Sequence, residues 1–391
     1  MSRRAEHRLA DRIASIAPFR VVEVMEKAWE VEATGRSVVH LVVGEPDFGT
    51  PAPVVAAASR AIADGHVHYT SSVGVPALRE AISSYYAERF GVDVAPSRIV
   101  VTAGASAALV LAFGATLDAG DEVILSDPGY PCNRNLIRLY GAAPVGAPVG
   151  PADNYQLSID ALAARWTDRT RGVLIGTPAN PTGTALTLQE LGELLRWTTG
   201  RGGLSFVDEV YGELVYDRPR ATALSCSGDV FVVNSFSKTF GMTGWRLGWL
   251  VCPEWAIDAV TRLAQNLYIS PPGPAQFGAL AAFTPEVWAI VEQRRVVFEA
   301  RRDLLVGGLR ELGFGVPLMP QGAFYVYARC DRFAADSSEL VWRLLNEAGV
   351  AVAPGDDFGA FEAERHVRFS YAASLDALHE ALARLDAFAR S

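Results

Sequence analysis

Six short apolar runs between residues 98 and 252 constrain the fold more than any other feature of the sequence. They alternate with helical or loop stretches, which is typical of a mostly parallel β-sheet with helices on both faces. The runs are RIVVT, DEVILS, RGVLIGT, GLSFVDE, DVFVVNS and RLGWLVC. Four of them lead into small or polar segments, namely AGAS, PANPTG, EVY and FSK. Because ligands of such sheets collect at the carboxyl ends of the strands, we expect a binding site there.

The chain after this region predicts a second, smaller α/β unit. Apolar residues at helical spacing predict a long helix from about residue 285, interrupted in its pattern only by Gly307 and Gly308. FYVYA and HVRFSYA predict strands, whereas ELVWRLLNEAG and LDALHEALARLDAFA predict helices. GEPDFGTP predicts a turn. We expect an N-terminal arm that forms part of the small domain (1–48), a large domain (49–286) and a C-terminal small domain (287–391).

Composition excludes several classes of partner. The 391 residues have a net charge of -9 without a run of like charges, so we expect neither nucleic acid nor an anionic membrane surface, and small-molecule chemistry is favoured. The N-terminus carries charges throughout, which predicts no signal peptide, no spanning helix and a cytoplasmic protein. The cysteines lack a CxxC pair, which predicts buried residues without a disulfide or a metal site. They are Cys132, Cys226, Cys252 and Cys330.

The junction VVTAGASAALVLAF places Gly104, Ala105 and Ser106 at the start of a predicted helix. Free backbone N–H groups and the helix dipole suit a phosphate there, although a tight strand-to-helix turn is the simpler interpretation. GASAA also resembles the GxSxG nucleophile elbow of α/β-hydrolases without its last glycine, which would make Ser106 a nucleophile. Its partner would be His366 or His379. That hypothesis leaves the other strand ends unexplained.

One of only two lysines in the chain, Lys238, lies in the motif SFSKTFGMTGWRLGW. The other 33 of the 35 basic residues are arginine, so surface charge alone does not account for a lysine here. A desolvated amine can act as nucleophile or base, which a guanidinium cannot. Ser235 and Arg246 of the same motif suit phosphate oxygens. An amine beside a phosphate clamp indicates pyridoxal 5'-phosphate, and a glycine-rich loop with a snorkelling lysine is the simpler alternative.

Three residues at the other strand ends match the needs of this cofactor. Asp208 at the end of LSFVD could keep a pyridine nitrogen protonated, as an electron sink requires. Tyr211 and Asn180 could donate hydrogen bonds to the ring's phenolate oxygen. Taken singly, Asp208 is a candidate helix cap and NPTG a candidate turn. Their joint placement favours a single site.

Together these motifs resemble the class I/II aminotransferases of pyridoxal phosphate (PLP) fold type I, over nearly the whole chain. The resemblance is carried by SFSKTFGMTGWRLGW, TPANPTGT, FVDEVYGEL, VGEPDF, YTSSVGVPALREAI and VRFSYA. It implies a large PLP-binding domain whose mostly parallel, seven-stranded sheet lies between helices, and a smaller α/β domain. It also implies a homodimer whose active site is shared between subunits.

The resemblance implies a role for each matching residue. Lys238 would bind the cofactor as a Schiff base and would be catalytic together with Asp208 and Tyr211. The further cofactor contacts would be Gly104, Ala105, Ser106, Tyr130, Asn180, Ser235, Arg246 and, from the neighbouring subunit, Tyr69. The substrate contacts would be Arg368, which grips the α-carboxylate, with Asn180 and Gly44.

The expected reaction is ping-pong transamination between an α-amino acid and a 2-oxo acid. A PLP-dependent lyase or β/γ-replacement enzyme uses the same motifs and is the alternative; an α/β-hydrolase using Ser106 is the remote one.

The sequence departs from the family pattern in two places. Residues 104–106 differ from the Gly-Gly-Lys or Ser-Gly-Thr of many relatives, and the sequence has no clear second arginine for a dicarboxylic substrate. Substrate side-chain contacts are expected around Phe19 and in YISPPGP (268–274).

Overall fold

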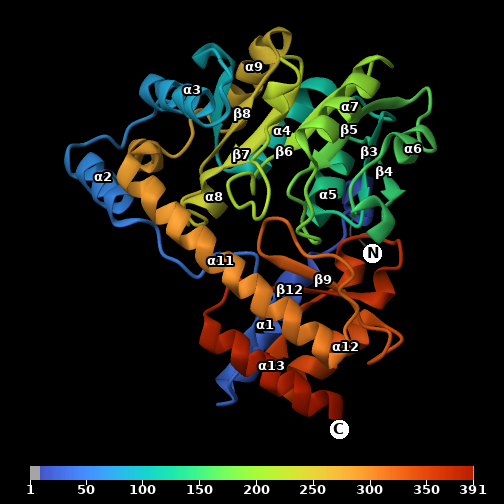
Figure 1. Cartoon of the computed structure of the whole chain (residues 1–391). Coiled ribbons are helices and arrows are strands. Elements are labelled where there is room, and N and C mark those ends of the chain that lie inside the picture. The colour runs from blue at the N-terminus through green and yellow to red at the C-terminus, as the bar shows by residue number, and fades with distance from the viewer. Residues whose placement is uncertain (1–8, 391) are drawn as a thin grey trace, which may run out of the picture.

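The structure is a computed structural model that describes residues 9–390, so residues 1–8 of the predicted arm and residue 391 lie outside it (Figure 1). Its largest element is a seven-stranded sheet with the order β2-β8-β7-β6-β5-β3-β4. The strands are β2 (Ile99–Thr102), β3 (Glu122–Asp127), β4 (Ala143–Pro148), β5 (Thr170–Gly176), β6 (Leu204–Asp208), β7 (Phe231–Ser235) and β8 (Gly248–Val251). Neighbouring strands are parallel except where β8 pairs with β2 and β7. The predicted fold class is confirmed.

Six of these strands coincide with the six apolar runs, and β4 is the strand that the runs did not reveal. Its sequence APVGAP has a single branched apolar residue, and most of its residues are partly or fully exposed. An edge strand is covered less completely than a central one, so it needs no continuous apolar run.

Thirteen α-helices and five further strands complete the part of the chain that the structure describes. The helices are α1 (Arg20–Ala33), α2 (Ala52–Ala63), α3 (Pro76–Phe90), α4 (Ala105–Thr116), α5 (Pro131–Leu139), α6 (Ile159–Ala163), α7 (Leu188–Thr199), α8 (Phe236–Thr239), α9 (Ile257–Leu267), α10 (Gly273–Ala279), α11 (Pro285–Leu312), α12 (Ser337–Arg343) and α13 (Leu375–Arg390). The strands are β1 (Val39–His40), β9 (Tyr325–Arg329), β10 (Val350–Ala351), β11 (Ala353–Pro354) and β12 (His366–Ser370).

The large sheet separates two apolar layers, because successive side chains of a strand point to opposite faces. In β2, Val100 packs into one buried cluster, whereas Ile99 and Val101 pack into the other. Helix α4 packs on β7 and β8 together with α9 on the first face, and α7 packs against β6. Both faces of the sheet are thus buried, which explains why the runs are continuously apolar.

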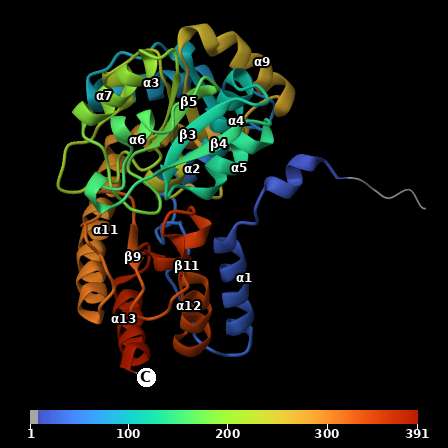
Figure 2. The same ribbon diagram turned by 90° about the vertical axis from the view of Figure 1, so that its right-hand side faces the viewer.

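The smaller unit is a three-stranded antiparallel sheet, β11-β12-β9, with α12 and α13 near it. Figure 2 shows α1 beside this unit, although α1 is near the N-terminus. Strand β1 pairs in parallel with β10, so an N-terminal segment completes the C-terminal unit. The division at residues 48 and 286 stays a prediction; its second boundary falls in the first turn of α11.

Helix α11 links the two units and is continuous through Gly307 and Gly308 (Figure 1). A β-carbon at position 308 would lie 2.5 Å from two atoms of Leu382, so glycine permits the close packing of α13 on α11. The interruption in the apolar pattern therefore marks a helix contact and not a break.

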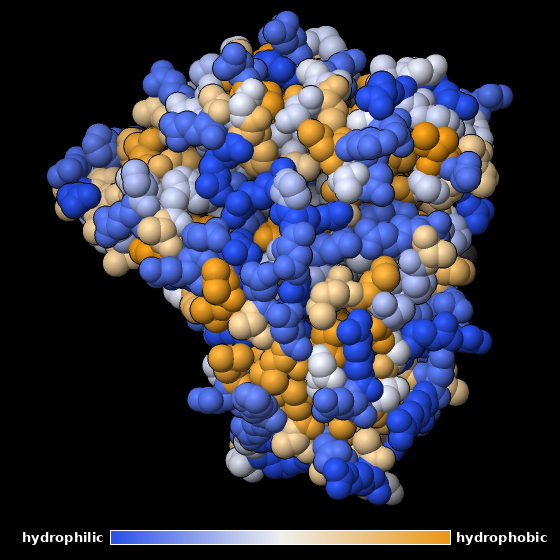
Figure 3. All heavy atoms as spheres, viewed as in Figure 1, coloured by the Kyte–Doolittle hydropathy of each residue, from blue (hydrophilic) through white to orange (hydrophobic). Residues whose placement is uncertain are grey.

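The surface and the cysteines complete the description. On the face shown in Figure 3, hydrophilic side chains form a band across the middle of the molecule, and hydrophobic residues occur in separate groups. Among residues 9–390, no helix is long and apolar enough to cross a membrane.

All four cysteines are free, but only Cys252 and Cys330 are buried. The prediction of burial was wrong for Cys132 and Cys226, which are partly exposed.

Candidate active site

A cavity of about 370 Å³ lies at the carboxyl edge of the large sheet, where β5, β6 and β7 end. Segments from the N-terminal arm and from the smaller unit close it. Eleven of the thirteen residues proposed from the sequence line this cavity: Gly44, Ala105, Ser106, Tyr130, Asn180, Asp208, Tyr211, Ser235, Lys238, Arg246 and Arg368. The structure therefore brings together residues that the sequence places more than 300 positions apart.

Two predicted residues lie outside the cavity lining. Gly104 is behind it, where it packs against the guanidinium of Arg246. Tyr69 is 79% exposed and contributes nothing to the cavity of its own chain.

Lys238 reaches the cavity from α8, the short helix that follows β7 directly. Its Nζ donates a hydrogen bond of 2.6 Å to the carbonyl oxygen of Gly44. Burial lowers the pKa of the amine to about 8, and the charge of Glu45 opposes this shift. A useful fraction of the amine is therefore neutral near physiological pH, as a nucleophile or base requires.

Asp208 is the last residue of β6 and faces the same cavity. Burial raises the pKa of its carboxyl to about 6, while a hydrogen bond of 3.1 Å from the N–H of Val210 opposes the shift. A cationic ligand beside this carboxylate would stabilise its charged form and so offset the free-energy cost of burying that charge. The carboxylate is therefore suited to a protonated ring nitrogen.

Arg368 on β12 is 1% exposed, yet it has no carboxylate within ion-pair distance among residues 9–390. Its guanidinium donates to Asn180 Oδ1 at 2.9 Å and to the carbonyl of Val42 at 2.6 Å. It lies over the rings of Tyr325 at 4.3 Å and Phe358 at 4.8 Å, and its Nε has no partner. A buried cation without an anion is costly, so this position suits an anionic ligand.

Tyr325 is a cavity residue that the sequence interpretation missed. Its hydroxyl shares a hydrogen bond of 2.8 Å with that of Tyr211, and both rings are buried. A β-carbon at position 44 would lie 2.4 Å from the Tyr325 hydroxyl, so only glycine fits there. The strand FYVYA gave no signal for this role, because an aromatic residue in a buried strand is ordinary packing.

The opposite end of the cavity is built around the start of α4. Gly104 has a φ of 81°, and a β-carbon there would lie 2.6 Å from Nη2 of Arg246. Arg246 itself has a left-handed backbone with a φ of 52°, an unfavourable conformation that directs its guanidinium across this turn. Ala105 and Ser106 begin the helix, so their N–H groups lack carbonyl acceptors within it. Such an arrangement suits a phosphate.

Hydroxyl groups complete this end of the cavity. Ser235 Oγ donates toward Ser237 Oγ at 2.9 Å and accepts from the N–H of Ser237 at 3.0 Å. Ser237, the next serine of the motif SFSKTFGMTGWRLGW, also lines the cavity. The loop 268–274, proposed for substrate contact, does not line the cavity of this chain.

The hydrolase hypothesis is wrong. His366 is buried, stacks on Tyr327 at 4.6 Å and bonds the carbonyl of Glu362, whereas His379 is exposed on α13. Neither histidine lines the cavity that holds Ser106.

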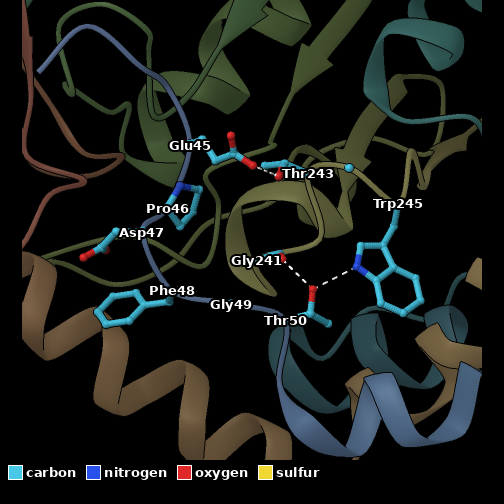
Figure 4. Close-up of a pocket in the computed structure, with 10 residues that line it drawn as sticks. Glu45, Pro46, Asp47, Phe48, Gly49, Thr50, Gly241, Thr243 and Trp245 are labelled. Carbon is cyan, nitrogen blue, oxygen red and sulfur yellow. Dashed lines mark hydrogen bonds between the residues drawn. The ribbon is translucent and has the colours of Figure 1, made fainter. Parts of the chain in front are cut away.

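A second cavity, of about 510 Å³, adjoins the first and shares Glu45 and Thr243 with it (Figure 4). It lies between segment 45–50 and the loop 241–245. The Thr50 hydroxyl donates to the carbonyl of Gly241 at 2.8 Å and accepts from Trp245 Nε1 at 2.9 Å, as the dashed lines in Figure 4 show. The hydroxyl of Thr243 donates to Glu45. The irregular segment predicted from GEPDFGTP thus bridges the two cavities.

Comparison with known proteins agrees with this geometry. The sequence profile of the family "Aminotransferase class I and II" matches residues 36–385. The valine–pyruvate aminotransferase of Mycobacterium tuberculosis is 40% identical over 382 residues, which are 96% of this chain and 98% of that protein. An aspartate aminotransferase of Geobacillus stearothermophilus is 36% identical over 97% of this chain and 98% of its own length.

Solved structures show the same likeness. A crystal structure of an aminotransferase from Mycobacterium tuberculosis superposes with a TM-score of 0.94 and 39% identity, over 98% of this chain and 99% of that chain. The aspartate aminotransferase of Thermus thermophilus with maleate has a TM-score of 0.93 and 36% identity, over 98% of this chain and 100% of its own.

Proposed function

This chain belongs to the aminotransferase class I and II family, and we propose that the cavity at the carboxyl edge of its large sheet is where the amino group is transferred. The protein moves an amino group between an α-amino acid and a 2-oxo acid by a ping-pong mechanism and uses pyridoxal phosphate. The relatives named above are aminotransferases, which favours transamination over the lyase and replacement alternatives.

The residues of the cavity fit this cofactor. The amine of Lys238 has a lowered pKa, and the left-handed glycine at position 104 leaves room for Arg246 at the start of α4. The chemistry that bound pyridoxal phosphate supplies is an aldehyde that takes up the amino group and an electron sink that acidifies the substrate's Cα–H.

Lys238 is the acid–base residue in this proposal. Near pH 8 its Nζ can take the proton from Cα of the amino donor in one half-reaction and supply the proton to Cα of the new amino acid in the other, because both protonation states are populated. The hydrogen bond from Nζ to the carbonyl of Gly44 holds the amine on the arm side of the cavity. Tethering on α8 keeps the amine near the reacting carbon throughout the reaction.

The ring of the cofactor would be held by three side chains. Asp208 would face the ring nitrogen and keep it protonated. Tyr211 would donate to the ring oxygen, and its hydrogen bond with Tyr325 fixes the direction of its hydroxyl. Asn180 accepts from Arg368 through Oδ1, which leaves its amide nitrogen as a donor for the same oxygen.

The observation that carries the proposal is the buried guanidinium of Arg368, which has no ion-pair partner among the described residues and lies in a cavity that also holds a deprotonatable lysine. A substrate α-carboxylate would supply the missing charge through charge-assisted hydrogen bonds. Arg368 also bonds Asn180, so the substrate and cofactor contacts are joined.

The phosphate would bind at the start of α4, to the N–H groups of Ala105 and Ser106, to Ser235 and to Arg246. The exposed Tyr69 supports a homodimer in which this residue reaches the phosphate of the second copy. A twofold dimer is also the commonest assembly of such proteins. A cytoplasmic location remains part of the same proposal.

Borohydride reduction tests the assignment of Lys238. We expect the cofactor-loaded protein to absorb visible light and, after reduction and digestion, to carry the cofactor on the peptide that contains Lys238. Lys238→Arg keeps the positive charge but should lose the label, and Lys27→Arg is the control that should keep it. Label on Lys27, or no label, would overturn the proposal.

A further inference from the structure

The charges of the first cavity limit what the substrate can be. Its lining includes five side chains that carry charge: Glu45, Asp208, Lys238, Arg246 and Arg368. The proposed function assigns the amine to the reaction, Arg246 to the phosphate and Arg368 to the α-carboxylate. Among the described residues of this chain, no cation of the lining is left for a second carboxylate on the substrate, and the two acids would repel one.

The wall that the N-terminal arm contributes is apolar. Phe19, Val21 and Met25 line the cavity from the start of α1. The ring of Phe19 meets that of Tyr130 edge-on, with centroids 6.1 Å apart and planes at 85°. The family resemblance makes Tyr130 a contact of the cofactor, so the neighbouring Phe19 borders the space in which the substrate would lie. Cys132 from α5 continues this uncharged surface.

We propose that the amino donor is an α-amino acid with an uncharged, mainly apolar side chain, which packs against the wall formed by Phe19, Val21 and Met25. This inference rests on the proposed function, because it takes Arg368 as the α-carboxylate site. The named relatives do not decide the matter, since their names point to different amino acids.

Asp357 is the positioning residue for this wall. It is 6% exposed, and its carboxylate accepts the N–H groups of Arg20 at 3.2 Å and Val21 at 3.3 Å, which are the first two residues of α1. A carboxylate at a helix N-terminus compensates unpaired N–H groups and the helix dipole. Phe19 precedes these residues directly, so the position of its ring depends on a carboxylate from the C-terminal unit.

A second link connects the same loop to the other side of the wall. Arg134 on α5 donates to the carbonyls of Phe358 at 2.6 Å and Asp357 at 2.9 Å. The loop of Asp357 therefore holds both α1 and the helix that carries Cys132. Phe358 also lies against Arg368, so the side-chain wall and the α-carboxylate site adjoin at this loop.

The selectivity is tested with single amino acids and no acceptor. The cofactor-loaded protein is mixed with leucine, valine, phenylalanine, aspartate, glutamate or lysine, and the absorbance of the cofactor is followed. We expect the apolar amino acids to react at least about 100-fold faster than the charged ones at equal concentration, because the apolar wall of Phe19, Val21 and Met25 offers a charged side chain no partner. Aspartate reacting as fast as leucine would overturn the inference and leave the proposed function standing. No reaction with any amino acid would contradict the proposed function itself.

Phe19→Ala tests the wall directly. We expect KM for leucine to rise about 10-fold, since a buried apolar contact is lost, and KM for alanine, whose side chain is too short for the wall, to stay within about twofold. Trp29→Ala is the matched control, because Trp29 is an aromatic residue of α1, the helix that begins directly after Phe19, and is 53% exposed and outside the cavity. An equal rise for alanine and leucine would show that Phe19 does not contact the side chain.

Asp357→Asn tests the positioning role. We expect KM for leucine to rise about fivefold with kcat for alanine unchanged, and Asp357→Glu to restore part of the loss. Asp336→Asn is the control, because Asp336 caps α12 by accepting the N–H groups of Ser338 at 2.7 Å and Glu339 at 3.1 Å, away from the cavity. A fall in kcat for both substrates, or the same effect from Asp336→Asn, would show that Asp357 has only a general structural role. Either result would overturn its assignment as the positioning residue of the wall.

Discussion

Lys238 and Arg368 are two cations that the fold holds in one cavity without an ion pair in the described part of the chain. The two respond differently to burial. A guanidinium keeps its charge when it is buried, so Arg368 is suited to bind an anionic ligand. An ammonium loses its proton more readily when it is removed from water, because its pKa falls. This difference explains why a chain that otherwise relies on arginine has a lysine at position 238.

The lowered pKa of Lys238 predicts the pH dependence of cofactor capture. Burial disfavours the charged amine, so the neutral, reactive form grows as pH rises through about 8 and is complete above it. At pH 7.5, about a quarter of the Lys238 amines would be neutral, against about one in a thousand for an ordinary lysine. We expect the rate at which the cofactor-free protein binds pyridoxal phosphate to increase from pH 6 and level off above pH 9, as followed by absorbance. A rate that still climbs steeply beyond pH 10 would contradict a lowered pKa.

At the scale of elements, α11 holds the irregular segment 45–50, which lines the second cavity and adjoins the first through Glu45. Arg301 of α11 forms a two-pronged ion pair with Asp47 at 2.7 and 2.8 Å and lies over the ring of Phe48 at 4.8 Å. Arg294, two turns earlier, donates to the carbonyl of Gly49 at 2.8 Å. Figure 4 shows this segment running beside the helix. A segment without regular structure is thereby fixed next to Gly44 and the Lys238 amine.

The ion pair between Arg301 and Asp47 should contribute measurably to stability. Arg301 has a side-chain exposure of 5%, so Asp47→Asn would leave a buried charge without its partner. We expect this substitution to lower the free energy of unfolding by about 2 kcal/mol, less than the full cost of an entirely buried pair because Asp47 is 30% exposed. Denaturant unfolding of Asp47→Asn, Arg301→Met and the double variant would give the coupling energy.

The exposed pair of Asp386 and Arg390 on α13 is the control for this cycle. Its atoms are 2.7 Å apart, but its side chains are 42% and 77% exposed. Solvent screening should hold its coupling below about 0.5 kcal/mol. Equal coupling energies for the two pairs would show that α11 does not fix the segment through Arg301.

At the scale of the whole molecule, the single chain holds Tyr69 in solvent while the other predicted phosphate contacts gather in one place. A tyrosine that is 79% exposed and outside the cavity has no role in its own chain's site. The proposed dimer gives it one, because a twofold axis would bring each Tyr69 to the other subunit's phosphate.

Mixing two inactive variants tests the shared site. Tyr69→Glu puts a carboxylate against the phosphate, and Lys238→Ala removes the amine, so each homodimer should be nearly inactive. In a shared-site heterodimer one site carries both lesions and the other is intact. Random reassortment after co-refolding makes half of the dimers mixed, so about a quarter of wild-type activity should return. If each Tyr69 serves its own subunit, every site keeps one lesion and activity stays absent.

The strands and their polar ends could be predicted from the sequence because each depends on neighbouring residues. Continuous apolar runs marked six buried strands, and Asp208, Ser235 and Lys238 follow such runs directly. The covalent order of the chain alone brings these residues to one edge once the strands are parallel. Edge strand β4 could not be predicted in this way, because its partly exposed residues do not form a continuous apolar run.

Tertiary structure alone decided which distant residues complete the cavity. Tyr325 meets Tyr211 and excludes a side chain at Gly44, and Asp357 holds the start of α1 across 336 residues of sequence. That Nε of Arg368 has no hydrogen-bond partner among residues 9–390 is likewise visible only when every neighbour is in place. A local pattern in the sequence indicates which secondary structure a segment favours, which of its faces is buried and which motif it contains. The packing of one unit against another depends on contacts that no local pattern encodes.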